Sequence, residues 1–258
     1  MFPCVLSAMV ARGSVMNDPV SRRVLRESVA VALTNLVALR QGGLGSLPLP
    51  EDAPKIVIEG PDPDRILLAG SGVVTGYGVA SHSLGVGGHL ARHLGAATER
   101  GVVLDVLPLP SLLLRFVPAH FATIDLNGYA AVILAVGVNE SFGFTSLSSW
   151  RESLIATLRL LQERMSPGGQ VFLVLIADPT SSPLFRERPA RRASARARVF
   201  NQETRRVVQN EPNVTTLEFE IGDVSHEPRL YDATSYQRWA RQLSPPVVEG
   251  LRRRRSLG

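Results

Sequence analysis

The distribution of apolar positions predicts alternating strands and helices from about residue 65 onward. Short apolar runs bounded by turn residues are typical of buried strands, and they lie at 65–69, 102–107, 130–138, 171–177 and 214–221. Longer segments with a helical spacing of apolar residues lie at 84–99, 147–165, 191–209 and 235–254. This order of repeated βαβ units predicts a mostly parallel, five-stranded sheet with helices on both faces.

The first 60 residues have a different pattern. One helix is predicted over 20–40, with Pro19 in its first turn, and a proline-stiffened connector follows at 47–54. We therefore expect three parts in the chain. They are an N-terminal helix and connector at 1–60, one α/β domain at 61–245 and a basic C-terminal tail at 246–258.

In a doubly wound sheet, the functional groups follow the carboxyl ends of the strands. The loop after the first predicted strand is rich in glycine, with Gly70, Gly72 and Gly76 before the next helix. One interpretation is a phosphate loop that binds a nucleotide or S-adenosylmethionine. The spacing differs from the G-x-G-x-x-G motif, and a tight structural turn between strand and helix explains the same residues.

A more specific interpretation comes from several blocks in a fixed order. Residues 65–79 read RILLAGSGVVTGYGV and residues 129–140 read YAAVILAVGVNE, followed by the strand at 171–177 and the helix start at 231–240. These blocks resemble those of the SGNH, or GDSL-type, hydrolases. The resemblance implies a three-layer α/β/α, doubly wound, flavodoxin-like domain. Most members of that family cleave carboxylic or acetyl esters.

The resemblance also implies a serine nucleophile in the first block and an oxyanion held partly by an asparagine in the third. Asn139 matches the asparagine, and its side-chain amide is the expected oxyanion donor. Gly72 stands at the family's serine position. Ser71, one residue earlier, carries the hydroxyl in the centre of the loop and is therefore the provisional nucleophile.

The histidine that the resemblance implies as the base is also missing from its expected position. Leu230 occupies the family's histidine position, and the nearest histidine, His226, lies four residues earlier. His82, just beyond the first loop, is the other provisional partner of Ser71. Asp178, after the fourth predicted strand, is a further residue that this geometry would direct to the same crevice.

Two functions therefore stay open. The first is a hydrolase that acts on a small-molecule carboxylic ester or acyl group through Ser71, Asn139 and His226. The alternative is a catalytically inactive protein of the same fold that binds a ligand or a partner, because losing either member of a nucleophile and base pair lowers kcat by several orders of magnitude.

Composition and charge limit the classes of molecule that the protein is expected to bind. The chain has 258 residues, 45% of them hydrophobic, and a formal net charge of +5, with Lys55 as its only lysine. Arginines gather at 186–206 and at 252–255. Neither run is interleaved with the aromatic residues on which single-stranded nucleic acids stack, so no nucleic-acid partner is expected and a solvated helix face is favoured.

The remaining features concern membranes, redox state and metals. No run reaches the ~18 apolar residues that a transmembrane helix needs, and the apolar stretch at 2–11 lacks the basic n-region of a signal peptide. The single cysteine, Cys4, excludes an internal disulfide, and together these features favour a cytoplasmic over a secreted protein. His89 and His93 have an i, i+4 spacing but no third ligand nearby, and neither a metal nor a cofactor is predicted.

Overall fold

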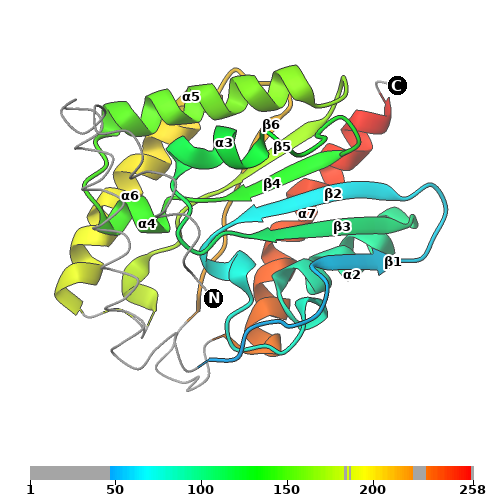
Figure 1. The fold of residues 1–258 in the computed structure, drawn as a ribbon, viewed down its shortest axis with the longest axis horizontal. Coiled ribbons are helices and arrows are strands. Elements are labelled where there is room, and N and C mark those ends of the chain that lie inside the picture. Colours follow the sequence, from blue (N-terminus) through cyan, green and yellow to red (C-terminus); the bar gives the residue numbers. More distant parts are fainter. Residues whose placement is uncertain (1–46, 183–184, 186, 223–230, 257–258) are drawn as a thin grey trace, which may run out of the picture.

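The computed structural model describes residues 47–182, 185, 187–222 and 231–256, so the predicted helix at 20–40 lies outside the described residues. One six-stranded sheet has the order β1-β3-β2-β4-β5-β6. The strands are β1 (Lys55–Ile58), β2 (Asp64–Gly70), β3 (Val102–Pro108), β4 (Ala131–Ala135), β5 (Gln170–Val174) and β6 (Val214–Leu217). Strands β2 to β6 run parallel, and β1 pairs antiparallel with β3 (Figure 1).

The predicted α/β, doubly wound architecture is confirmed, with one strand more than the five that were predicted. The additional strand, β1, lies at residues that the sequence assigns to the proline-rich connector. It has four residues and contributes one buried side chain, Ile56, to the core, whereas Val57 is exposed. Its apolar run, 56–58, has only three residues and is too short to distinguish a strand from a linker.

Helices cover both faces of the sheet and complete the three layers (Figure 1). Helices α2 (Val86–Thr98) and α7 (Ala233–Ser256) share one hydrophobic core with the sheet. The other face is covered by α3 (Val117–Phe121), α5 (Leu147–Arg164) and α6 (Glu187–Val208). Among the described residues, no helix is long and apolar enough to cross a membrane.

The C-terminal segment differs from the predicted basic tail. Helix α7 continues to Ser256, and Val247 and Leu251 are buried in the core beside α2. Arg255 also reaches the sheet, because its guanidinium lies 2.9 Å from the carboxylate of Asp64, which is itself buried. The arginines at 252–255 therefore belong to the last turns of a helix whose apolar face packs on the domain.

The strand order decides where a ligand site can form. Strand β2 pairs with β3 on one side and with β4 on the other, so the chain changes direction across the sheet at β2. Loops that leave β2 and β4 at their carboxyl ends diverge to opposite faces and leave a crevice between them. The short helix α4 (Val138–Phe142) begins on the β4 side of this crevice.

Candidate functional site

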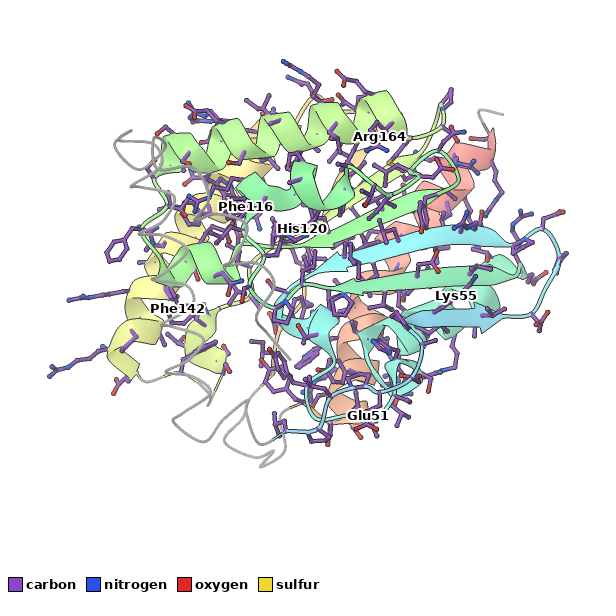
Figure 2. The ribbon with its side chains drawn as sticks, viewed as in Figure 1. Glu51, Lys55, Phe116, His120, Phe142 and Arg164 are labelled. Carbon is purple, nitrogen blue, oxygen red and sulfur yellow. The ribbon has the colours of Figure 1, made fainter. Side chains whose placement is uncertain are left out.

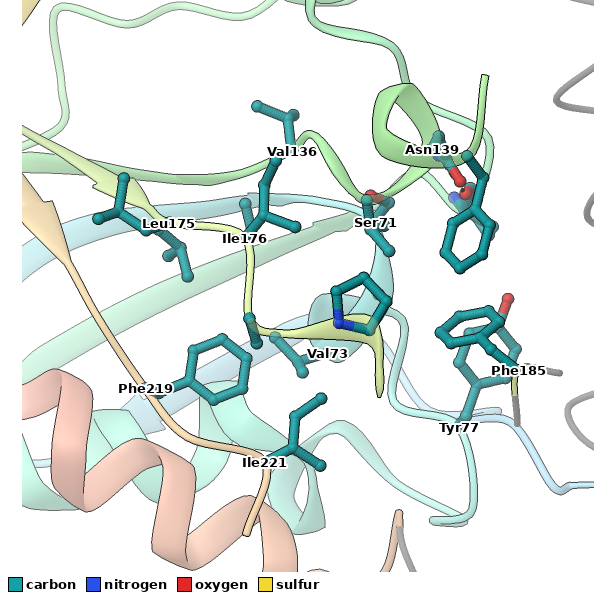
Figure 3. A pocket seen from close by; sticks show the side chains of 18 of the residues that line it. Ser71, Val73, Tyr77, Val136, Asn139, Leu175, Ile176, Phe185, Phe219 and Ile221 are labelled. Carbon is teal, nitrogen blue, oxygen red and sulfur yellow. Dashed lines mark hydrogen bonds between the residues drawn. The ribbon is translucent and has the colours of Figure 1, made fainter. Parts of the chain in front are cut away.

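A pocket of about 120 Å³ opens at the carboxyl ends of the parallel strands. Its walls come mainly from the loops that follow β2, β4, β5 and β6, with Pro110 added from the loop after β3, and Figure 3 shows side chains converging from the first four of these segments. Most of the lining is apolar, including Val73, Val136, Leu175, Ile176, Phe219 and Ile221. The described lining residues include no Asp, Glu, Lys, Arg or His side chain. The pocket therefore suits an uncharged, largely apolar group.

Ser71 lies in this pocket, directly after β2. Its backbone N–H donates a hydrogen bond to Ala135 O at 2.9 Å, which ties the β2 loop to the end of β4. Its side chain is 3% exposed, and the hydroxyl has no hydrogen-bond partner among the described residues. The Ser71 side chain thus belongs to the pocket lining, and no base lies within hydrogen-bond reach of its hydroxyl in the described part of the chain.

Gly72 follows at the position where the hydrolase family has its serine. Its backbone is left-handed, with φ of 62°. A Cβ built there would meet a single atom within 4 Å, Val138 Cγ1 at 3.9 Å. A side chain at this position would therefore enter open space beside the pocket wall, and the glycine leaves that space without a hydroxyl.

Asn139 lines the same pocket from α4, so the loop after β2, with Ser71, and the segment after β4, with Asn139, meet in one crevice. Its side-chain nitrogen donates to two backbone carbonyls, Pro110 O at 3.0 Å and Leu112 O at 2.9 Å. An amide nitrogen has two hydrogens to donate. Both are engaged here, and the side chain fastens α4 to the segment that follows β3.

We expect Asn139→Ala to destabilise the domain by about 1–3 kcal/mol, because the buried carbonyl of Leu112 and the partly buried carbonyl of Pro110 would lose their donor. Urea denaturation of the purified protein measures this change. Asn210, which is exposed in the turn after α6, provides the control Asn210→Ala. An unchanged midpoint in Asn139→Ala would mean that the amide is free for another role.

Of the two histidines proposed as a base, the structure describes only His82. His226 lies outside the described residues, although the described residues Ile221 and Tyr231 near the two ends of its segment both line the pocket. His82 is buried, and its Nδ1 lies 2.8 Å from Asp52 Oδ1, which also accepts its backbone N–H. His82 does not line the pocket. Its contacts instead hold the segment before β1 against the domain.

Two tyrosines complete the pocket, and neither was singled out from the sequence. The rings of Tyr77 and Tyr231 meet edge to face at 6.4 Å, and Tyr236 Oη donates to the backbone O of Tyr77. Burial raises the pKa of Tyr231 to about 12, so its phenol stays neutral. Gly78 is the sequence feature that could have pointed to these tyrosines. A Cβ at this position would lie 1.8 Å from Tyr231 O, so only glycine permits the close approach of the two segments.

Glu140 was also missed, although it directly follows Asn139. Its carboxylate is fully buried, accepts a hydrogen bond from Leu114 N at 2.5 Å, and has its second oxygen unpartnered among the described residues. Burial raises the pKa of Glu140 to about 7. Asn139 and Glu140 together hold the segment from Pro110 to Leu114, and so one wall of the pocket, in place.

The other candidate residues lie elsewhere. Asp178 is exposed and caps a short turn by accepting the backbone N–H of Thr180, so it does not line the pocket. His89 Nδ1 lies 3.0 Å from a guanidinium nitrogen of Arg92. Among the described residues, no group of three or more His, Cys, Asp or Glu side chains could hold a metal ion.

Comparison with known proteins is informative for the fold. No protein-family model and no curated protein sequence matches the chain. Among solved structures, a protein designated a GDSL-like lipase from Bacteroides ovatus is 16% identical with a TM-score of 0.56, over 75% of this chain and 55% of that one. The chain has the fold of the GDSL-type, or SGNH, hydrolases. The predicted resemblance is thereby confirmed at the level of the fold.

Two further solved structures are similar to the chain. A family two carbohydrate esterase from Clostridium thermocellum has a TM-score of 0.56 at 13% identity, over 75% of this chain and 66% of that one. A protein designated a lipolytic member of the G-D-S-L family from Desulfitobacterium hafniense has a TM-score of 0.53 at 12% identity, over 70% of this chain and 97% of that one. This chain thus spans little more than half of the Bacteroides protein and two thirds of the esterase.

Proposed function

We propose that this protein binds a neutral acyl or similarly apolar ligand in the pocket of its GDSL-type fold, without ester hydrolysis. The observation that carries the proposal is the state of Asn139, both of whose amide hydrogens are donated to backbone carbonyls. An oxyanion donor must point at the place where charge develops in the transition state. An amide engaged on both hydrogens does not fulfil that condition.

Two other groups support the same proposal. The backbone N–H of Ser71, which the resemblance to the hydrolases would make a second oxyanion donor, donates instead to Ala135 O. Gly72 places no hydroxyl at the family's nucleophile position. Removing one oxyanion donor lowers kcat about 10²–10³-fold, and an unactivated serine adds a larger loss. With these losses combined, binding is the activity that the pocket retains.

The lining defines the ligand class. An ionised carboxylate or ammonium in this pocket would lose its hydration without gaining an opposite charge from any described lining residue. An apolar chain or ring instead gains ~25 cal/mol for each Å² of surface that it buries against the walls. The Ser71 hydroxyl, which lacks a partner among the described residues, can donate one hydrogen bond to a neutral carbonyl.

Octanamide, which has an apolar chain and a neutral carbonyl, tests the binding. At about 100 times its Kd, it should raise the melting temperature by about 5 °C or more. Val73→Trp should abolish this shift, because Val73 lies on the pocket wall beside Phe219 and Ile221 (Figure 3). The matched control is Val57→Trp, at an exposed position on the edge strand β1. Equal shifts in wild type and Val73→Trp would refute binding in this pocket.

Ester hydrolysis through Ser71 is the second candidate function. It is favoured by one observation, the buried Ser71 hydroxyl in the pocket lining, which has no hydrogen-bond partner among the described residues. His226 would be its base. If this function holds, p-nitrophenyl octanoate is turned over, Ser71→Ala and His226→Ala each lower kcat by about 10³-fold or more, and a fluorophosphonate probe labels the wild type. We expect none of the three results.

A further inference from the structure

The outer face of helix α6 is strongly basic. Six exposed arginines lie along its 22 residues, at Arg188, Arg191, Arg192, Arg198, Arg205 and Arg206. The only exposed carboxylate on the helix is that of Glu187. Residues three and four apart share one face of a helix, so these arginines form a stripe about 30 Å long on the side opposite the core.

The charges of this stripe are unevenly compensated. Near the C-terminal end, Arg205 pairs with Glu218 at 2.8 Å and Arg206 lies 3.9 Å from Glu203. Near the N-terminal end, Arg191 pairs with Glu187 at 2.7 Å, whereas Arg188 and Arg192 form no ion pair with a carboxylate among the described residues. The uncompensated positive charge of the helix therefore lies at the end where α6 begins.

This end of α6 adjoins an exposed aromatic side chain and the pocket. Phe144 is 73% exposed, and its neighbour Thr145 accepts a hydrogen bond from Arg196 on α6 at 2.6 Å. Phe185, two residues before α6 begins, packs on Phe142 with ring centroids 4.5 Å apart, and both rings line the pocket. Figures 1 and 2 show α4, with Phe142, beside α6 at the edge of the molecule where the strands end.

We propose that the first half of α6 and Phe144 dock on an anionic lipid bilayer and hold the pocket against the membrane that supplies its acyl ligand. We call the residues Arg188, Arg192 and Phe144 the docking surface. Basic side chains attract the anionic headgroups, while an exposed aromatic ring enters the interface. This inference rests on the proposed binding of an apolar ligand.

A nucleic acid is the other polyanion that arginines attract. Sequence-tolerant binders of single strands stack successive bases on several aromatic side chains. The exposed positions between the arginines of α6 are instead Pro189, Ala195, Val199 and Gln202, none of them aromatic, and Phe144 is a single exposed ring. Apolar side chains among basic ones favour a lipid interface.

Sedimentation with phosphatidylcholine vesicles, with and without phosphatidylserine, tests the docking surface. The wild type should bind the anionic vesicles selectively, and added salt should weaken the binding. Because each arginine near such a surface strengthens binding about fivefold, Arg188→Glu with Arg192→Glu should weaken it about 30-fold or more. Phe144→Ser should weaken binding while leaving its salt dependence intact.

The matched control is the pair Arg159→Glu and Arg241→Glu, at exposed positions on α5 and α7, because it changes the net charge by the same amount. Retained vesicle binding in this control supports a defined surface. An equal loss in both double variants would overturn the proposal, since the net charge alone would then explain binding. Tighter binding of a single-stranded RNA than of anionic vesicles at the same salt concentration would also overturn it.

The pocket variant separates this inference from the function on which it rests. Val73→Trp fills the pocket but leaves Arg188, Arg192 and Phe144 unchanged, so it should bind anionic vesicles as the wild type does. Octanamide binding that persists without any vesicle binding would refute the docking surface and leave the pocket proposal standing. Vesicle binding without octanamide binding would refute the pocket proposal.

Discussion

Replacing Gly70 with alanine should destabilise the protein by about 3–5 kcal/mol. A Cβ at this position would lie 1.9 Å from Ala135 O and 2.7 Å from Ala135 C, both of which belong to the backbone of β4. The φ of Gly70 is also 139°, which side chains disfavour. Strands β2 and β4 would have to separate where the pocket begins, and urea denaturation should show the loss.

Gly72→Ala is the matched control for this substitution. Gly72 also has a positive φ, of 62°, but an added Cβ there finds open space. Only the left-handed backbone is then unfavourable, at about 1–2 kcal/mol. Similar losses in Gly70→Ala and Gly72→Ala would show that the close contact between β2 and β4 does not limit residue 70.

The strands were predictable because parallel strands are buried on both faces and read as continuous apolar runs. Three predicted strands are too long, because apolar residues continue beyond the end of the strand, as Phe219 and Ile221 do beyond β6 in the run at 214–221. The run at 130–138 includes Val136 and Val138, and the run at 171–177 includes Ile176, yet β4 and β5 end before these residues. Their side chains are apolar because they line the pocket rather than pair in the sheet. Apolar residues of a ligand site that directly follow a strand thus make the strand look longer in the sequence than it is.

Part of the site followed from strand order alone. The order of the blocks predicted that Ser71 and Asn139 share a crevice, and both line one pocket. The partners of these residues were not predictable, since Asn139 bonds to carbonyls 27 and 29 residues earlier and His82 to a carboxylate 30 residues earlier. Hydrogen bonds over such separations depend on loop paths that apolar periodicity does not encode.

The pH dependence of stability should reveal the buried carboxyl of Glu140. Its pKa is about 7 in the folded protein, because burial opposes ionisation more than Leu114 N and Arg115 favour it, against an ordinary value of 4.5. Between these two values the folded state binds more protons than the unfolded state, so the free energy of unfolding falls as the pH rises. The contribution is fully present below about pH 4.5 and is lost through about pH 7, a change of about 3 kcal/mol.

Glu140→Gln isolates this contribution, because the amide keeps an oxygen for Leu114 N and does not titrate. Other carboxylates act in the opposite direction, since the hydrogen bond from Arg151 lowers the pKa of Glu203. The measurement is therefore the difference between wild type and variant in urea denaturation, which should shift in favour of Glu140→Gln by about 3 kcal/mol between about pH 5 and about pH 8. Glu152→Gln, at an exposed position on α5, should show no such shift. A constant difference for Glu140→Gln would mean that the carboxyl is ionised throughout, and that the wall from Pro110 to Leu114 is held by a charge rather than by a neutral acid.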